Sequence, residues 1–495
     1  MSRLIAIVMA AGQGTRMKSP LPKVLHTACG RPLVYYPVRA ALDLGAEQVV
    51  VVVNAHIHAV LSAALAEHIP PQSLTFAFQD VPRGTGDAVI AGLAGLSLAE
   101  DDRVLILSGD TPLLTQADLL PLSAALSDEV ALSFMYFCAP DPTGYGRVIR
   151  DTAGMPVQIV EQRDLKSEAQ RAIVEVNAGV YLARAGALKN ALLHLTNKNA
   201  QGEYYLTDIV SLIAQQTRTS AVEADRDALA GVNDRAQLNQ VERILHERVR
   251  RRWGELGVTM VGEPCIDDTV TLEADVRIES GVRLRGRTHV GAGTFIDVGS
   301  VVEDGQIGKN AAIKPYCVVT SSHVGDGVAL GPFAHLRPGS VLLDNAHVGN
   351  FVETKNARIG KGAKANHLAY VGDAEVGDGA NLGAGTIICN YDGVFKHHTD
   401  IGRGANIGAG TIICNYDGVF KHRTAIGAGA FIGSNTALVA PVSVGARALV
   451  AAGSVVTADV PDGALAIARG RQETKPALGQ RMMERLRALK AQGAR

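Results

Sequence analysis

The sequence predicts two domains of different architecture: an α/β domain with a Rossmann-like, mainly parallel sheet, and then a left-handed parallel β-helix. The 495 residues exceed what one ordinary hydrophobic core accommodates. The first part of the chain alternates short β-branched runs with helical stretches, and the second part repeats an apolar residue at intervals of six. We expect the α/β domain over 1–232, a linker helix over 233–256, the β-helix over 257–470 and a C-terminal arm over 471–495.

Five runs of buried-type residues are expected to form the strands of the first domain. They are Leu4–Met9, Gln48–Val53, Leu74–Phe78, Val104–Leu107 and Ala131–Phe137. Because helical stretches separate these runs, the pattern indicates βαβ units with parallel strands. Ligands of such sheets bind in the crevice beyond the carboxyl ends of the strands.

Residues 233–256 show a helical pattern. Asn233 or Asp234 can cap this helix, and its apolar side chains recur every three or four positions from Leu238 to Trp253. We interpret its basic run, 248–252, as a solvated face. A second, short helix is expected over Met482–Lys490 in the C-terminal arm.

Six-residue units dominate the chain from about 258 to 457. Many of them begin with a branched apolar residue followed by glycine, for example Val324-Gly325, Leu330-Gly331, Val348-Gly349 and Ile426-Gly427. One apolar position in six cannot form an amphipathic helix, but it supplies one inward side chain to each of three faces of a coil. Such a solenoid usually needs capping or oligomerisation, because each coil buries only its neighbours.

The composition narrows the class of partner. A formal net charge of -1 and a pI near 6.9 favour neither a nucleic acid nor a membrane surface. No apolar stretch reaches 18 residues, and the first apolar run is expected to be a buried strand rather than a leader. The six cysteines lack metal-ligand spacing, so we expect small buried thiols in a reducing, cytoplasmic protein.

A glycine-containing loop follows the first expected strand. Residues 9–17 read Met-Ala-Ala-Gly-Gln-Gly-Thr-Arg-Met, and Leu21-Pro22-Lys23 comes shortly after. Small residues let backbone N–H groups approach phosphate oxygens, while Arg16 and Lys23 add positive charge. This combination predicts a phosphate-binding loop rather than a surface turn.

This loop resembles that of the sugar-1-phosphate nucleotidyltransferases, and further motifs follow in order. They are Gln79, Gly84-Thr85-Gly86, Ser108-Gly109-Asp110, Tyr145-Gly146-Arg147, Glu161-Gln162-Arg163, residues 175–179 and residues 203–208. With the hexapeptide half, residues 4–470 resemble the bacterial bifunctional N-acetylglucosamine-1-phosphate uridyltransferase/glucosamine-1-phosphate N-acetyltransferase family. Met9 stands where that family usually has leucine. Because both side chains are apolar and similar in volume, this departure does little to weaken the resemblance.

The resemblance implies that the first domain transfers UMP from UTP to N-acetylglucosamine 1-phosphate. Arg16 and Lys23 would stabilise charge during the transfer, and Mg²⁺, a cation that prefers few protein oxygens, would be held by Asp110 and Asn233. The residues that would bind the nucleotide and the sugar are Met9, Ala10, Ala11, Gly12, Lys23, Gln79, Gly84, Thr85, Ser108, Gly109, Asp110, Gly146, Glu161, Asn177 and Asn233.

For the β-helix, the resemblance implies acetylation of glucosamine 1-phosphate by acetyl-CoA, at a site formed between the subunits of a homotrimer. His367 would be the general base, because the pKa of imidazole lies near the working pH. Arg337, Lys355, Tyr370 and Asn381 would bind the sugar phosphate. The residues that would contact acetyl-CoA are Ala384, Asn390, Tyr391, Asn415, Tyr416, Ser434, Ala452 and Arg469.

The chain departs from the family in one segment. Residues 376–400 recur as 401–425 with 20 of 25 positions identical, whereas the family has one copy. The length fits one coil with a protruding loop, so the fold should accept it. Everything after the insert would move by one coil, roughly 4.8 Å. We therefore expect an impaired or altered acetyltransferase beside an unaffected uridyltransferase.

Three alternative functions are considered. The β-helix could serve only to trimerise a monofunctional uridyltransferase. The chain could be an adenylyl- or guanylyltransferase with a regulatory tail, although His367 and the long β-helix disfavour this. A metalloenzyme of the carbonic-anhydrase kind would need a triad among His335, His347 and His367, whose spacing does not support one.

Overall fold

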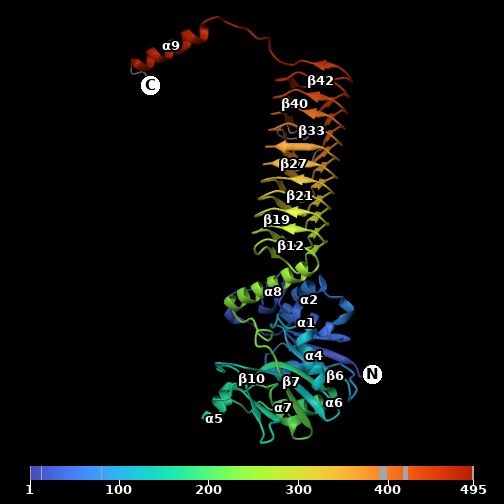
Figure 1. Cartoon of the computed structure of the whole chain (residues 1–495), viewed down its shortest axis with the longest axis vertical. Coiled ribbons are helices and arrows are strands. Elements are labelled where there is room, and N and C mark those ends of the chain that lie inside the picture. The colour runs from blue at the N-terminus through green and yellow to red at the C-terminus, as the bar shows by residue number, and fades with distance from the viewer. Residues whose placement is uncertain (1, 13, 80, 390–397, 416–421, 493–495) are drawn as a thin grey trace. The chain divides into compact units, whose positions relative to one another are not determined.

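The structure is a computed structural model that describes residues 2–12, 14–79, 81–389, 398–415 and 422–492 (Figure 1). The chain divides into two compact units. The first comprises Met1–Arg252 with Ile266–Thr269, and the second comprises Trp253–Cys265 with Val270–Arg495.

The first unit is built on a sheet with strand order β11-β7-β10-β6-β1-β4-β5. Strands β1, β4, β5 and β6 are mutually parallel, and β10 runs antiparallel to β6 and β7. This confirms the predicted fold class. The strands are β1 (Leu4–Met9), β4 (Gln48–Val53), β5 (Leu74–Phe78), β6 (Arg103–Ser108), β7 (Val130–Cys138), β8 (Arg147–Arg150), β9 (Pro156–Val160), β10 (Glu175–Arg184) and β11 (Arg218–Glu223), with β2 (Thr27–Ala28) and β3 (Arg31–Pro32) paired apart.

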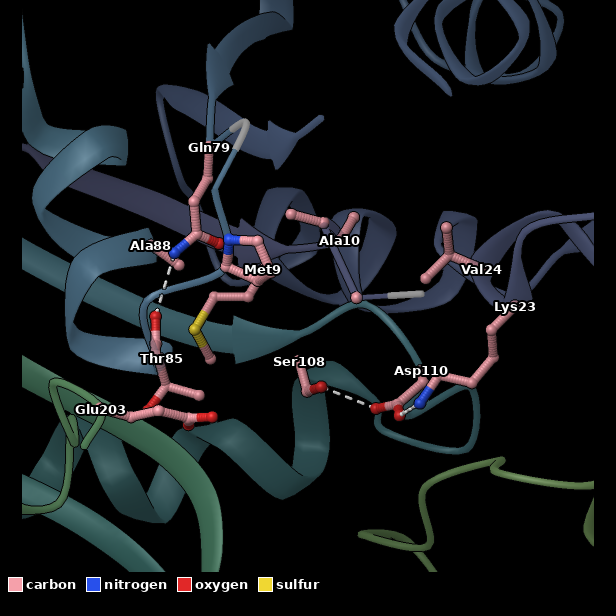
Figure 2. Close-up of a pocket in the computed structure, with 14 residues that line it drawn as sticks. Met9, Ala10, Lys23, Val24, Gln79, Thr85, Ala88, Ser108, Asp110 and Glu203 are labelled. Atoms are coloured by element: carbon pink, nitrogen blue, oxygen red, sulfur yellow. Dashed lines mark hydrogen bonds and ion pairs between the residues drawn. The ribbon is translucent and has the colours of Figure 1, made fainter. Parts of the chain in front are cut away.

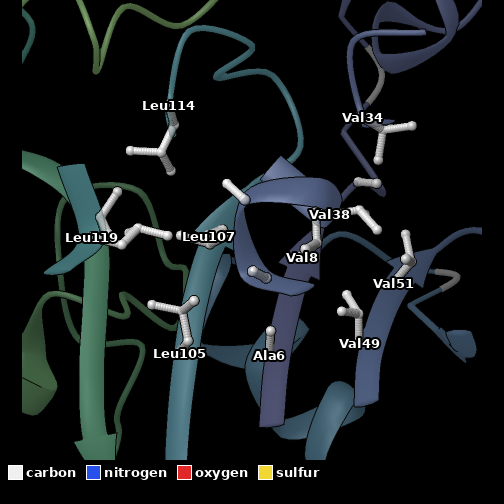
Figure 3. Close-up of a cluster of buried hydrophobic side chains, with 14 of the residues drawn as sticks. Ala6, Val8, Val34, Val38, Val49, Val51, Leu105, Leu107, Leu114 and Leu119 are labelled. Carbon is white, nitrogen blue, oxygen red and sulfur yellow. The ribbon is translucent and has the colours of Figure 1, made fainter. Parts of the chain in front are cut away.

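Helices cover both faces of this sheet, which explains why its central strands are apolar throughout. On one face, Val8, Val51 and Leu107 pack with Val38 and Leu119 (Figure 3). On the other face, alternate strand residues pack beneath other helices. The helices are α1 (Tyr35–Asp43), α2 (Ala55–Ala66), α3 (Thr85–Leu93), α4 (Gln116–Ala125), α5 (Glu168–Arg171), α6 (Ala185–Leu193) and α7 (Asp208–Ala214), with 3₁₀ turns η1 (Thr15–Met17), η2 (Lys23–Leu25), η3 (Pro71–Ser73) and η4 (Gln162–Asp164).

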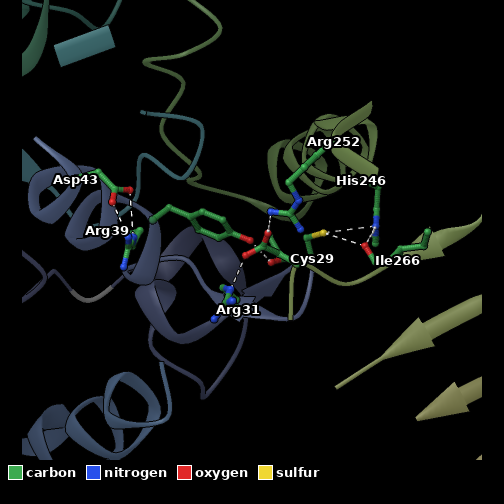
Figure 4. A network of polar contacts seen from close by, with 10 residues as sticks. Cys29, Arg31, Arg39, Asp43, His246, Arg252 and Ile266 are labelled. Atoms are coloured by element: carbon green, nitrogen blue, oxygen red, sulfur yellow. Dashed lines mark hydrogen bonds and ion pairs between the residues drawn. The ribbon is translucent and has the colours of Figure 1, made fainter. Parts of the chain in front are cut away.

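Helix α8 (Arg235–Glu255) occupies the segment where the linker helix was predicted. Within the first unit, a polar network joins it to the β2–β3 hairpin (Figure 4). Asp268 accepts from Arg31 Nε at 2.6 Å and from Arg252 Nη1 at 2.8 Å. Cys29 Sγ donates to the Ile266 carbonyl at 3.3 Å. Burial raises the pKa of the Cys29 thiol, so it stays protonated and serves as a donor rather than a nucleophile.

The second unit is a left-handed parallel β-helix with three parallel sheets (Figure 1). Every coil from β12 to β41 contributes one strand to each sheet, and the last coils contribute fewer. The first sheet contains β12 (Thr259–Met260), β15 (Arg277–Ile278), β18 (Phe295–Ile296), β21 (Ala312–Ile313), β24 (Ala329–Leu330), β27 (His347–Asn350), β30 (Lys364–His367), β33 (Asn381–Leu382), β36 (Asn406–Ile407), β39 (Phe431–Ile432), β42 (Leu449–Val450) and β44 (Leu465–Ala466). The second contains β13 (Cys265–Ile266), β16 (Arg283–Arg285), β19 (Val301–Glu303), β22 (Val318–Thr320), β25 (His335–Leu336), β28 (Glu353–Lys355), β31 (Tyr370–Gly372), β34 (Ile387–Cys389), β37 (Ile412–Cys414), β40 (Ala437–Val439) and β43 (Val455–Val456). The third contains β14 (Thr271–Leu272), β17 (His289–Val290), β20 (Gln306–Ile307), β23 (His323–Val324), β26 (Val341–Leu342), β29 (Arg358–Ile359), β32 (Ala374–Val376), β35 (Thr399–Ile401), β38 (Thr424–Ile426) and β41 (Val442–Val444).

The repeated segment forms one additional coil in register. Its strands β36, β37 and β38 pair with β33, β34 and β35 of the first copy, and Ile387 lies opposite Ile412. Asn415 of the second copy is fully buried, donates to Thr399 Oγ1 at 2.7 Å and accepts from Thr424 Oγ1 at 2.6 Å. The Asn415 amide thus bridges the hydroxyls of two threonines that lie opposite each other on successive coils.

The cysteines depart from the sequence-based expectation in part. Cys29 and Cys317 are buried, but Cys138 and Cys265 are exposed. Cys138 is the last residue of β7, and Cys265 lies at an outward position of its coil, so neither points into a core. Within the described ranges, helix α9 (Leu478–Ala491) forms part of the arm, and no helix is long and apolar enough to cross a membrane.

Replacing Asn415 by Ala should destabilise the β-helix. The change leaves two buried threonine hydroxyls without their partner, and each such group costs about 1–3 kcal/mol. We expect the free energy of unfolding of this unit to fall by about 2–4 kcal/mol, measured by denaturant titration followed by circular dichroism. Cys414→Ala, at a half-buried neighbouring position, is the matched control, and an equal loss in both variants would contradict the role assigned to the amide.

Candidate functional site

The predicted phosphate loop starts where β1 ends at the carboxyl edge of the sheet. The Ala10 N–H donates to the Val52 carbonyl, which holds the first loop residue against β4. Gly14 has a φ of +60°, and a Cβ there would lie 2.4 Å from Lys23 Cβ, so only glycine fits. The loop is therefore folded back so that η2 presents Lys23 beside it.

Lys23 lies between two oxygen-bearing side chains. Its Nζ forms an ion pair with Asp110 Oδ2 (Figure 2). The same Nζ donates to Asn233 Oδ1 at 3.2 Å. Arg16 Nη2 also donates to Asn233 Oδ1, at 2.9 Å. Ser108 Oγ donates to Asp110 Oδ1 at 2.6 Å, which orients the carboxylate at the end of β6. Two cations and two oxygen ligands thus converge at one point.

The start of α8 explains why Asn233 is free to join this cluster. The structure places Asp234, not Asn233, at the helix N-terminus, where Asp234 Oδ1 accepts from the Gln237 N–H at 2.9 Å. Gln237 Oε1 accepts in turn from the Asn233 N–H at 2.7 Å. The Val232 N–H donates to the Asp110 carbonyl at 2.8 Å, which fixes the segment against β6.

Gln79 and Gly84 form the opposite wall of the same pocket (Figure 2). Gly84 has a φ of +122°, and a Cβ there would lie 2.4 Å from the Tyr204 carbonyl oxygen, so glycine is required. Thr85 Oγ1 accepts from the Leu206 N–H at 3.1 Å. The Gln79 side chain is 8% exposed and donates from Nε2 to the Gly84 carbonyl at 3.0 Å.

A second pocket contains the residues predicted to bind the sugar: Gly146, Glu161 and Asn177. The Asn177 N–H donates to the Gly146 carbonyl at 2.9 Å, and Asn177 Nδ2 donates to Tyr181 Oη at 2.7 Å. Burial raises the pKa of the Glu161 carboxyl, although a hydrogen bond from Thr207 Oγ1 at 3.1 Å opposes this. The pocket is thus polar and rigid.

The two pockets adjoin, because Met9, Thr85, Ser108 and Asp110 line both of them. The first pocket also gathers Ala10, Ala11, Gly12, Lys23, Gln79 and Gly84. Arg16 and Gly109 do not line either pocket; Arg16 reaches the cluster through Asn233, and the Gly109 N–H donates to the Met9 carbonyl. Sequence reasoning gave no site role to Glu203, which lines the first pocket, although Glu203 begins one of the quoted motifs. It also missed Gln237 and Gln240, which line the second pocket, because their helix α8 was interpreted as a linker.

In the β-helix, His367 ends strand β30 and is exposed. Its Nδ1 lies 2.6 Å from Asn350 Oδ1 on the preceding coil. An amide oxygen only accepts, so in this arrangement Nδ1 carries the proton and Nε2 keeps its lone pair. This tautomer is the one that a general base requires.

The predicted sugar-binding residues of this unit and His367 fall on four successive coils. Arg337 Nη1 pairs with Glu353 Oε1 at 2.8 Å, and Tyr370 lies opposite Glu353 in the second sheet, which also carries Lys355. Asn381 begins β33 and donates from Nδ2 to Asn406 Oδ1 at 2.9 Å. Asn390, Tyr391 and Tyr416 lie outside the described residues. The Asn415 side chain is buried and bonded at both ends, so, contrary to expectation, it is not available to a ligand.

Of the predicted acetyl-CoA residues, Ala384, Ser434 and Ala452 stack in one corner column. The Gly410 N–H donates to the Ala384 carbonyl, the Asn435 N–H to Ala409, and the Gly453 N–H to Ser434. Arg469 Nη1 donates to the Ala452 carbonyl at 2.9 Å. Ala409 of the inserted coil therefore separates Ala384 from Ser434.

Comparisons with known proteins match both units. The family of MobA-like NTP transferase domains matches residues 6–171, and the hexapeptide repeat of succinyl-transferase matches residues 423–458. A bifunctional protein GlmU of Sorangium cellulosum is 50% identical over 489 residues, 98% of each chain. Those of Pelobacter propionicus and Heliobacterium modesticaldum are 43% and 42% identical over 493 and 481 residues, covering 98% and 96% of this chain and 100% and 97% of theirs.

The chain belongs to the bifunctional GlmU family. This confirms the resemblance identified in the sequence and, with it, an enzyme that joins a nucleotidyltransferase domain to a hexapeptide acyltransferase domain. The described residues contain a candidate metal-binding group at Glu375, His398 and Asp400, but none that joins His335, His347 and His367.

Replacing Glu161 by Gln should stabilise the first unit in a pH-dependent way. Burial disfavours the carboxylate, so its folded pKa is raised and the wild type loses stability as the pH rises above the ordinary value of 4.5. Gln keeps the acceptor for Thr207 without the charge. We expect higher stability than wild type at neutral pH and no difference below pH 4.5, measured by urea unfolding across pH.

Glu67→Gln, at an exposed helix end, is the matched control for the same loss of one negative charge. A stability gain for Glu161→Gln that persisted unchanged into acid would contradict the explanation from burial.

Proposed function

We propose that this enzyme makes UDP-N-acetylglucosamine in two steps. The β-helix transfers an acetyl group from acetyl-CoA to glucosamine 1-phosphate, and the first unit then transfers UMP from UTP to N-acetylglucosamine 1-phosphate and releases pyrophosphate. The observation that carries the proposal is the pair of adjoining pockets that meet at Asp110, with the phosphate loop and Lys23 on one side and Glu161 and Asn177 on the other.

For the uridyl transfer, the chain mainly positions the reactants and stabilises charge. The backbone N–H groups of Ala11 and Gly12 face the triphosphate, while that of Ala10 is bonded to β4. Lys23 and Arg16 balance negative charge as the sugar phosphate oxygen attacks the α-phosphorus of UTP. Asp110 and Asn233 fit Mg²⁺, because both present oxygens to the same cation, the Lys23 ammonium. Bound there, Mg²⁺ would supply further neutralisation of phosphate charge.

For the acetyl transfer, His367 Nε2 accepts a proton from the sugar amine as the nitrogen attacks the thioester carbonyl. The C–S bond then breaks, and CoA leaves as its thiol with a proton returned to the sulfur. Asn350 holds the ring in the required tautomer through Nδ1. Arg337, Lys355, Tyr370 and Asn381 bind the sugar phosphate and hydroxyls. Ala384, Ser434, Ala452 and Arg469 contact acetyl-CoA along their corner column.

We propose a cytoplasmic homotrimer, in line with the family resemblance. An exposed apolar column on the β-helix supports the assembly. Tyr316, Phe333 and Phe351 stack with ring centroids 5.3 and 5.2 Å apart, and Leu368 follows them beside His367. Each is about half exposed, at 47–60%, which is a large apolar surface for a solvated corner and suits a second copy of the chain.

A second candidate function follows from the inserted coil: a uridyltransferase whose β-helix serves only as a trimerisation scaffold. One coil adds roughly 4.8 Å between His367 and Ser434. A misplacement of about 1 Å can already lower a rate about a hundredfold. The two half-reactions must therefore be measured separately on the full chain.

His367→Ala should separate the two activities. Loss of the general base should lower acetylation of glucosamine 1-phosphate by about 10²–10⁴-fold. Pyrophosphate release from UTP and N-acetylglucosamine 1-phosphate should stay at the wild-type rate, since His367 belongs to the other unit. Lys23→Ala is the reciprocal variant, with the opposite pattern. If the full chain releases no pyrophosphate, the uridyltransferase assignment is wrong.

Deleting 401–425 should restore acetyl transfer. The deletion returns Ser434 to the coil next to Ala384, so acetyl-CoA-dependent turnover should rise by about a hundredfold or more. Uridyl transfer should not change. Equal acetyl turnover with and without the inserted coil would sink the idea that this coil separates the two halves of the site.

A further inference from the structure

A buried carboxylate lies directly behind the nucleotide pocket. Asp87, on helix α3, is 8% exposed, and its Oδ2 accepts from Gln79 Nε2 at 2.8 Å. Its Oδ1 pairs with Arg83 Nη2 at 2.8 Å. The Arg83 side chain is 65% exposed, so the contact with Gln79 is the buried side of this carboxylate. The mechanism above assigns Asp87 no role.

The contacts of Gln79 determine which way its amide points. Nε2 donates to two groups, the Gly84 carbonyl and the Asp87 carboxylate. Both are acceptors only, so the atom between them must be the nitrogen, whichever way an amide is built. Both N–H groups of the Gln79 amide are thus donated to groups of the protein, Gly84 and Asp87, and Oε1 remains as the acceptor for a ligand.

This orientation distinguishes the two pyrimidines. Uracil carries a donor at N3 and an acceptor at position 4, whereas cytosine carries an acceptor at N3 and a donor at position 4. A fixed Oε1 can accept from uracil N3–H but meets only a lone pair at N3 of cytosine. An unpaired contact of this kind is a strong basis for discrimination, because the buried polar groups lose their partners.

We propose that Asp87 is a positioning residue that makes the first unit selective for uracil nucleotides, by holding Gln79 with its carbonyl oxygen toward the base. The inference rests on the proposed function, since it takes the base to lie at Gln79 (Figure 2). A flipped amide would set Oε1 against the Asp87 carboxylate and the Gly84 carbonyl, which replaces two hydrogen bonds by two repulsive contacts.

The test compares UTP with CTP on the full chain, using Asp87→Asn. An Asn side chain can donate as well as accept, so it tolerates both orientations of Gln79, while the Gly84 carbonyl still favours one. We expect the ratio of kcat/KM for UTP over CTP to fall by about tenfold or more, mainly through KM. Initial rates of pyrophosphate release at saturating N-acetylglucosamine 1-phosphate give the ratio.

Two controls isolate the contact with Gln79. Asp87→Asn and Arg83→Gln both remove the ion pair between Asp87 and Arg83. Because Arg83→Gln keeps the hydrogen bond between Asp87 and Gln79, its UTP/CTP ratio should stay at the wild-type value. In a Gln79→Ala background, Asp87→Asn should have no further effect on the ratio, since the two residues act as one unit. Asp87→Ser, whose hydroxyl can donate or accept, replaces Asp87→Asn if that variant does not fold.

Several outcomes would overturn the proposal. These are an unchanged ratio in folded Asp87→Asn, an equal fall in Arg83→Gln, or an Asp87→Asn effect that persists without Gln79. A wild-type enzyme that turns over UTP and CTP alike refutes this inference and leaves nucleotidyl transfer intact. A chain that uses neither nucleotide refutes the proposed function itself.

Discussion

Backbone hydrogen bonds between successive coils hold the β-helix together, and the arrangement of everything else in the second unit depends on them. Amides of one coil donate to carbonyls of an adjacent coil, as the Gly410 N–H does to the Ala384 carbonyl of the preceding coil, so corner residues stack directly over their counterparts. Residues far apart in sequence become neighbours along a column. A site can therefore be extended along such a column, and the column can be lengthened only by whole coils.

The first unit obeys a different constraint, the convergence of strand ends at one edge of a sheet. Lys23 links that edge to the start of α8, because its ammonium contacts Asp110 after β6 and Asn233 before the helix. The cation contacts two oxygen ligands from distant parts of the chain. A small number of charged contacts thus define both the geometry of the pocket and the path of the segment that leaves it.

Apolar runs made the central strands predictable, and β1, β4 and β5 have the predicted ends. Strand β11 was missed because its burial is partial, and β10 because its register shifts between Asn177 and Tyr181 and interrupts the alternation. The six-residue period predicted the second unit well, since every coil repeats the same short pattern of inward apolar side chains.

Those candidate site residues that belong to motifs occurring in the same order as in the resembling family could be predicted from the sequence. Asp87 was not, because nothing in its sequence context reveals that its carboxylate meets the Gln79 amide. Asn415 was expected to contact a ligand because it is the counterpart of Asn390 in the second copy. In the structure its side chain lies between two threonines of successive coils and is hydrogen-bonded to both. Both depend on contacts between distant positions, which local patterns do not encode.

The duplicated coil also has a consequence for how the chain folds. Residues 383–397 and 408–422 are identical, so either copy offers the growing β-helix nearly the same surface on which to add its next coil. A chain that skips one copy closes a larger loop, and loop length adds little to the entropic cost. What distinguishes the native register is the set of contacts made between unlike residues of the two copies, such as the ion pair of Arg423 Nη2 with Asp400 Oδ2 at 2.5 Å. Divergence at a few surface positions thus favours one register of an almost symmetric segment over the other.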